Sequence, residues 1–84
     1  MVDEFPIPTP NSAGARGNIT LGPDNNLWFT EYSGNKIGRI TPSGSISEFP
    51  IATKNSSPMG IVAGPDGNLW FVEADGNKLA SIAP

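Results

Sequence analysis

The chain has 84 residues, among them ten glycines and nine prolines but no cysteine and no histidine. The absence of cysteine excludes a disulfide framework, and without histidine as well a structural zinc site is not expected. The net charge is −3 and the five basic residues are scattered, so we expect no nucleic-acid partner. No segment approaches the roughly 20 apolar residues of a membrane span. The N-terminus also lacks a signal-peptide pattern, so we expect a soluble protein without a membrane partner, in a compartment that the sequence does not indicate.

Glycine, proline and asparagine divide the chain into many short apolar runs, which is typical of strands joined by tight turns. In chain order the first half contains an outer strand and then a unit of four strands, at residues 3–7, 19–21, 27–31, 36–40 and 45–49. The second half begins the same unit again, with strands at 61–63, 69–73 and 79–82. No segment has the 3.6-residue period of an amphipathic helix, so the predicted fold class is all-β.

The two halves are copies of one sequence unit. The octapeptide that starts at Gly22 (GPDNNLWF) returns 42 residues later at Gly64 (GPDGNLWF), and 14 of the 24 residues in 19–42 recur in 61–84. The tetrapeptide EFPI at Glu4 returns 44 residues later at Glu48. A repeated four-stranded unit of about 40 to 45 residues is typical of a β-propeller blade. The sequence therefore predicts two tandem propeller blades across residues 1–84.

Self-assembly is predicted because closed propellers usually need about four to eight blades. The chain opens on the outer strand 3–7, contains a full blade at about 18–50 and stops within a partial blade at about 60–83. We expect strand 3–7 to complete the last blade of a neighbouring copy, so that copies of the chain close a ring. Three copies would form six blades, the favoured arrangement, and four copies would form eight. The expected partner is thus the chain itself, as a homotrimer or alternatively a homotetramer.

Several phrases together carry a family resemblance: EFPI at Glu48 followed by PMGI at Pro58, the octapeptide at Gly64, and GNKIGRITP at Gly34. They closely resemble the blades of the streptogramin B lyases, the virginiamycin B lyase family. The resemblance implies a seven-bladed propeller and a Mg²⁺-assisted elimination that opens the ester of a cyclic depsipeptide antibiotic. It also implies a catalytic histidine on the loop before the innermost strand, with acidic residues nearby.

Only part of that machinery is present in this sequence. The family's histidine position falls at Met59, and at Gly17 in the other copy, and neither residue can transfer a proton. The partnering acid matches Glu31 and Glu73. We therefore expect a non-catalytic, self-assembling scaffold, or a weak binder of a ligand or cation at the mouth of the central channel. The alternative is a fragment or relative of a Mg²⁺-dependent streptogramin B lyase that opens cyclic depsipeptide antibiotics by elimination.

No catalytic residue is predicted, and the candidate contacts at the channel mouth are Glu31, Glu73, Tyr32, Arg16 and Met59. Glu31 and Glu73 end the second strand of each unit, so a ring would present a circle of carboxylates that could hold a divalent cation. Only the resemblance implies Mg²⁺, and no other cofactor is expected. Alternatively, each carboxylate accepts hydrogen bonds from neighbouring loop amides and fixes the spacing of the blades. Tyr32 and Arg16 are candidates because the other copy does not repeat them.

Two further sets of residues are predicted to be structural. The aromatic pairs Trp28–Phe29 and Trp70–Phe71 are adjacent within a strand, so one member of each should face each side of its sheet and pack between blades. Asp24 and Asp66 follow proline in a turn and should cap that turn through the local backbone.

Overall fold

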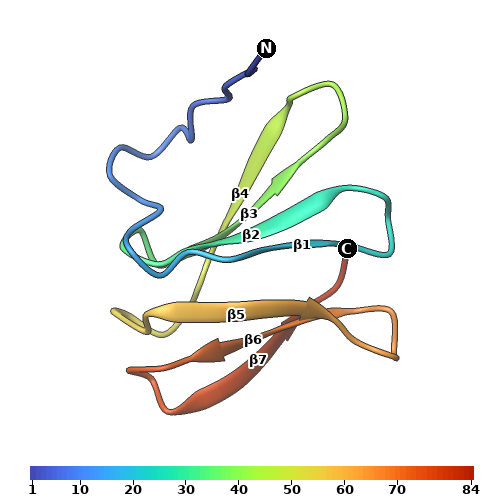
Figure 1. Ribbon diagram of the computed structural model, residues 1–84. Helices are drawn as coiled ribbons and strands as arrows, with labels where there is room; N and C mark the ends of the chain where they lie inside the picture. Colours follow the sequence, from blue (N-terminus) through green and yellow to red (C-terminus); the bar gives the residue numbers. More distant parts are fainter.

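The computed structural model describes all 84 residues and contains seven strands in two antiparallel sheets (Figure 1). The first sheet has the order β1-β2-β3-β4, formed by β1 (Ile19–Leu21), β2 (Leu27–Glu31), β3 (Lys36–Ile40) and β4 (Ile46–Pro50). The second has the order β5-β6-β7, formed by β5 (Pro58–Ala63), β6 (Leu69–Glu73) and β7 (Lys78–Ile82). The predicted all-β class is confirmed. No helix long and apolar enough to cross a membrane is present.

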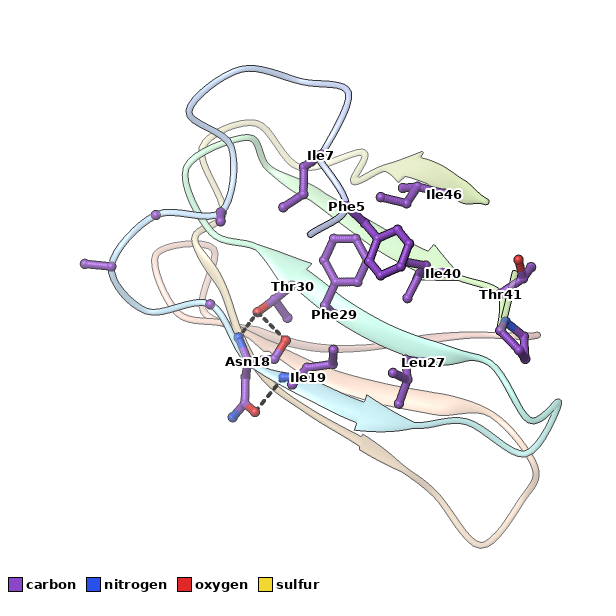
Figure 2. A pocket seen from close by; sticks show the side chains of 15 residues that line it. Phe5, Ile7, Asn18, Ile19, Leu27, Phe29, Thr30, Ile40, Thr41 and Ile46 are labelled. Atoms are coloured by element: carbon purple, nitrogen blue, oxygen red, sulfur yellow. Dashed lines mark hydrogen bonds between the residues drawn. The ribbon is translucent and has the colours of Figure 1, made fainter. Parts of the chain in front are cut away.

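The N-terminal segment is not a strand in the single chain, in contrast to the prediction. Residues 1–7 form no strand, whereas residues 3–7 were expected to be an outer strand. A strand needs a neighbour for its backbone hydrogen bonds, and this segment instead lies on one face of the first sheet, where Phe5 lies beside Phe29 and Ile40 (Figure 2). Pairing of the segment with another copy stays a prediction.

The two sheets pack face to face through one apolar core. Trp28 and Ile37 come from the first sheet and Ile61, Leu69 and Phe71 from the second, and none is more than 5% exposed. The predicted division of the aromatic pairs is confirmed, because Trp28 and Phe71 lie in this core while their strand neighbours face away from it. The strands β1 and β5 lie beside each other, as the innermost strands of adjacent propeller blades do.

The repeated GPD turn has the same construction in both sheets. In the first, Trp28 Nε1 donates a hydrogen bond of 2.9 Å to Asp24 Oδ1, which also accepts 3.2 Å from the amide of Asn26. In the second, Trp70 Nε1 donates 2.9 Å to Asp66 Oδ1. The predicted cap by aspartate is confirmed, and the tryptophan donor is an addition that the sequence pattern did not reveal. The motif therefore ties the turn to the aromatic strand that follows it.

Opposite the core, each sheet has an apolar face that the other sheet does not cover, although Phe5 and Ile7 lie over part of the face of the first sheet. The first outer face lies on the first sheet and includes Ile19, Leu21, Leu27, Phe29, Ile40 and Ile46. The second outer face lies on the second sheet and includes Val62, Trp70, Val72 and Leu79. Uncovered apolar patches of this kind mark interaction surfaces.

Candidate functional site

The predicted site residues lie at one end of the strands in both sheets. Glu31 ends β2 and Glu73 ends β6. The β2–β3 and β6–β7 turns lie at this end, on the left in Figure 1, together with the loops that lead into β1 and β5. The structure therefore brings the two glutamates to the same edge of the molecule, as the repeat predicts.

Glu31 is fully buried and bound within the first blade. Ser12 Oγ donates a hydrogen bond of 2.6 Å to Glu31 Oε1. Burial, and then a hydrogen bond with the carboxyl group of Glu48, raise the pKa of Glu31 to about 7. The same hydrogen bond lowers the pKa of Glu48. Neither Glu31 Oε2 nor Glu48 Oε2 has another hydrogen-bond partner, and the raised pKa of Glu31 favours its neutral form beside a charged Glu48.

The loop before β1 is anchored on this pair of carboxyl groups. Thr9 Oγ1 donates 3.1 Å to Glu48 Oε1, and Lys36 Nζ donates 2.6 Å to the same threonine oxygen. The amides of Ser33 and Gly34 donate to the carbonyl oxygen of Ser12 at 2.9 and 3.0 Å. The donor to Glu31 is thus a side-chain hydroxyl, and not the loop amides that the alternative interpretation names. A role of Glu31 in the spacing of the blades stays a prediction.

Glu73 has only part of the same environment. It is 5% exposed, and its Oε1 has no hydrogen-bond partner. Lys78 Nζ donates 2.8 Å to Thr53 Oγ1, which matches the Lys36–Thr9 bond of the first blade. Ser56, the repeat equivalent of Ser12, donates instead to Asn35 Oδ1 at 2.6 Å. The second sheet has no fourth strand in this chain, so nothing here corresponds to the Glu48 carboxyl group.

These residues do not fit a Mg²⁺ site. No group of three or more Asp, Glu, His or Cys side chains gathers anywhere in the chain. Glu31 Oε1 accepts the hydrogen bond from Ser12, and the raised pKa leaves the carboxyl group partly neutral at physiological pH. A hard divalent cation requires several anionic or carbonyl oxygens that remain free to coordinate it.

The other three predicted contacts lie at the same end of the strands as the two glutamates. Tyr32 is half-buried and its amide donates 3.1 Å to the carbonyl oxygen of Ala13, whereas Arg16 is exposed in the same loop. Met59 is half-buried in β5, opposite Val72. Contact of any of them with a ligand stays a prediction.

Sequence reasoning missed the partners that complete these environments. Arg39 lies over the rings of Trp28 and Phe49, 5.5 Å from each centroid, and the two rings stack at 5.7 Å. Asn35 and Ser12 hold the loops. The available signal was the second repeat, since the offset of 44 residues that relates Glu4 to Glu48 also relates Ser12 to Ser56.

The largest concavity is a hollow of about 680 Å³ on the first outer face. Figure 2 shows Phe5, Ile7, Phe29, Ile40 and Ile46 around it, all on one side of the first sheet. Its lining is predominantly apolar and carries no charged side chain. The hollow therefore has the chemistry of a packing surface.

The raised pKa of Glu31 predicts a pH-dependent stability. Because the folded chain holds this proton more tightly than the unfolded chain, the stabilisation is present below pH 4.5 and is lost as the pH rises through about 7. The free energy of unfolding should fall on the order of 1 kcal/mol between pH 5.5 and 8. Urea unfolding at the two pH values measures this difference. Glu31→Gln should remove it, and an unchanged difference in that variant would contradict the assignment.

Two consecutive antiparallel sheets, packed face to face with their first strands side by side, define a unit of a β-propeller. The sequence matches the virginiamycin B lyase family over residues 1–84, and the chain belongs to this family. The resemblance read from the repeated phrases is thereby confirmed.

The relatives are considerably longer than this chain. A virginiamycin B lyase from Bordetella parapertussis is 42% identical over 58 residues, which is 69% of this chain and 19% of the relative. One from Bacillus licheniformis is 46% identical over 43 residues, 51% of this chain and 14% of the relative. The chain therefore spans about a fifth or less of the curated relatives that it matches.

Solved structures show the same arrangement. A streptogramin B lyase structure superposes with a TM-score of 0.92 and 48% identity, covering 99% of this chain and 27% of the other. A catalytically inactive histidine-to-alanine variant of the virginiamycin B lyase from Staphylococcus aureus, with quinupristin, gives a TM-score of 0.78 and 44% identity, covering 96% of this chain and 30% of the other.

Proposed function

We propose that the chain is a self-assembling β-propeller unit, in which the second outer face of one copy packs on the first outer face of the next, and that it serves as a non-catalytic scaffold. One observation carries the proposal. Each outer face is the repeat equivalent of one half of the core that joins the two sheets within the chain.

The first outer face matches the half of the core contributed by the second sheet. Ile61 and Leu69 are 2% and 0% exposed, whereas their equivalents Ile19 and Leu27 are 57% and 42% exposed. Side chains that pack against a neighbouring blade in one copy of the repeat thus face solvent in the other. Burying them would contribute on the order of 25 cal/mol per Å² of apolar surface.

The second outer face matches the half contributed by the first sheet. Trp28 is fully buried and Trp70 is 37% exposed, and Ile37 is 1% exposed whereas Leu79 is 75% exposed. The two outer faces are therefore complementary to each other and not to themselves. Such a contact joins copies head to tail, and a repeated head-to-tail rotation generates a ring if it closes. We propose three copies with six blades, with four copies and eight blades as the alternative.

The absence of histidine supports a non-catalytic role. The variant of the Staphylococcus aureus relative is described as catalytically inactive with alanine in place of one histidine, and this chain has no histidine in any copy. A second candidate function is that of a lyase of streptogramin type, which the names of the relatives favour. Ring opening of quinupristin by this chain in the presence of Mg²⁺ is the observation that would favour the lyase.

The mass in solution tests the assembly. A monomer of 8.8 kDa gives about 26 kDa for a trimer and about 35 kDa for a tetramer. Light scattering on a sizing column should give one of these two masses at micromolar concentration. A folded species of 8.8 kDa, independent of concentration, would contradict the proposal.

A further inference from the structure

The outer edge of β7 is open, whereas the equivalent edge of β3 is paired. In the first blade, β4 pairs with β3 through the register Lys36↔Pro50, Gly38↔Glu48 and Ile40↔Ile46. The second sheet ends at β7. The segment that repeats β4 is the N-terminal one, because EFPI occurs at Glu4 and at Glu48. Figure 1 shows this segment beside the first blade and β7 at the opposite outer side of the molecule.

The turn before β7 offers an unused binding position for a loop. In the first blade, Asn35 Nδ2 donates 2.9 Å to the carbonyl oxygen of Thr53, and Asn35 Oδ1 accepts 3.0 Å from the amide of Ser56. The amide of Ile51 also donates 3.1 Å to the carbonyl oxygen of Asn35. Asn35 thereby holds the loop that follows β4.

Asn77 is the repeat equivalent of Asn35 in the second blade. It has the same left-handed backbone, with φ of 55° against 59°. Its side chain is exposed and makes no hydrogen bond. By the repeat, the groups that would bind it are Ile7, Thr9 and Ser12, in the loop that follows the N-terminal segment.

Glu73 also has no neighbour equivalent to β4, the strand that contributes Glu48 beside Glu31. In the first blade Thr9 accepts a bond from Lys36 and donates one to Glu48. In the second blade Thr53 accepts a bond from Lys78 but donates none. Glu73 Oε1 is buried without a hydrogen-bond partner, as are Glu31 Oε2 and Glu48 Oε2, but only the last two have a second carboxyl group beside them. The residue that repeats Glu48 is Glu4. One strand with the sequence of residues 2–7 on the open edge of β7 would therefore place a carboxyl group beside Glu73 and the loop that follows it beside Asn77.

We propose that residues 2–7 of a second copy add to β7 as the fourth strand of the second blade. The register of β3 and β4, carried over through the repeat, pairs Lys78 with Pro6, Ala80 with Glu4 and Ile82 with Val2 of that copy. The loop after the strand then binds Asn77, and Glu4 lies beside Glu73. This inference rests on the proposed assembly, to which it adds the segment and the register that latch one copy to the next.

Disulfide cross-linking tests the register directly, because the chain has no cysteine of its own. In the proposed register Asp3 lies opposite Ser81, as Ser47 lies opposite Arg39. Directly opposed residues in neighbouring strands are close enough for a disulfide. The full chain with Asp3→Cys and Ser81→Cys should form covalent dimers and larger species under mild oxidation. The matched control is Asp3→Cys with Ala80→Cys, whose side chains project to opposite faces, and it should cross-link roughly tenfold less.

The outcomes separate this inference from the proposed function. If the wild-type chain assembles but the two double variants cross-link equally, strand addition is wrong and packing of the outer faces remains. If the wild-type chain is monomeric, both proposals are wrong.

A second variant tests the position at Asn77 without cysteines. Asn77→Gly keeps the left-handed backbone available and removes only the side chain. It should raise the dissociation constant of the assembly about tenfold, since the side chain would donate and accept hydrogen bonds in the complex. Asn55→Gly is the control, because Asn55 is also exposed, with φ of 52°, and makes no hydrogen bond. Equal dissociation constants for the two variants would contradict the proposed role of Asn77.

Discussion

Leu79→Glu is expected to leave the chain folded but monomeric, with a mass of 8.8 kDa. Leu79 is 75% exposed in the single chain, so a glutamate there remains in water and leaves the fold unaffected. Its repeat equivalent Ile37 is 1% exposed in the core between the sheets. In the assembly the glutamate would occupy that environment without a partner, which costs several kcal/mol for a charged group. A loss of this size raises the dissociation constant by about a thousandfold.

Light scattering and circular dichroism together measure this outcome. The variant should keep the wild-type spectrum while its mass falls to that of one chain. Lys54→Gln is a matched control, because it makes the same change in net charge at an exposed loop position. An assembled Leu79→Glu variant would show that the second outer face is not the contact.

The strands could be predicted from the sequence because their signals are local. Turn residues and the octapeptide repeat place β2 and β6 directly, and the left-handed Asn25 and Gly67 lie where the turn needs them. The N-terminal segment could not be resolved in the same way. Its tetrapeptide is that of β4, but a strand forms only where another strand offers an edge, and no local sequence records which edge is free.

The candidate site shows the same limit. The repeat predicts that Glu31 and Glu73 end equivalent strands, and they do. It does not predict that Glu31 accepts a hydrogen bond from Ser12 and has the Glu48 carboxyl group beside it, while Ser56 donates elsewhere and the sheet of Glu73 has no fourth strand. Those partners come from loops and strands distant in sequence. Glu31 and Glu73 therefore have different environments, because only the first sheet has a fourth strand.

Gly22→Ala is expected to destabilise the chain by about 3 kcal/mol, the cost of forcing a methyl group into a closed core. A Cβ at Gly22 would lie 2.4 Å from Trp28 Cδ1 and 2.5 Å from its Nε1. Trp28 is fully buried and stacks on Phe49, so the indole cannot move aside. Any shift also breaks its hydrogen bond to Asp24, which leaves a buried donor unsatisfied.

Gly64→Ala is the matched control, because its Cβ would meet Trp70 at the same distances, 2.4 and 2.5 Å. Trp70 is 37% exposed and can tilt outward, so in the monomeric Leu79→Glu background the cost should be only about 1 kcal/mol. Urea unfolding of both glycine variants in that background measures the difference. Equal costs would contradict the view that burial of the indole fixes the outcome.

The same pair of variants also reports on assembly. If the first outer face of a second copy covers Trp70, the indole can no longer tilt outward. In the assembled chain Gly64→Ala should then reduce the free energy of unfolding as much as Gly22→Ala does. The cost of Gly64→Ala would then rise by about 2 kcal/mol between the monomeric background and the assembly. If that cost stays the same in both states, Trp70 remains open to solvent in the oligomer, and the copies associate through another surface.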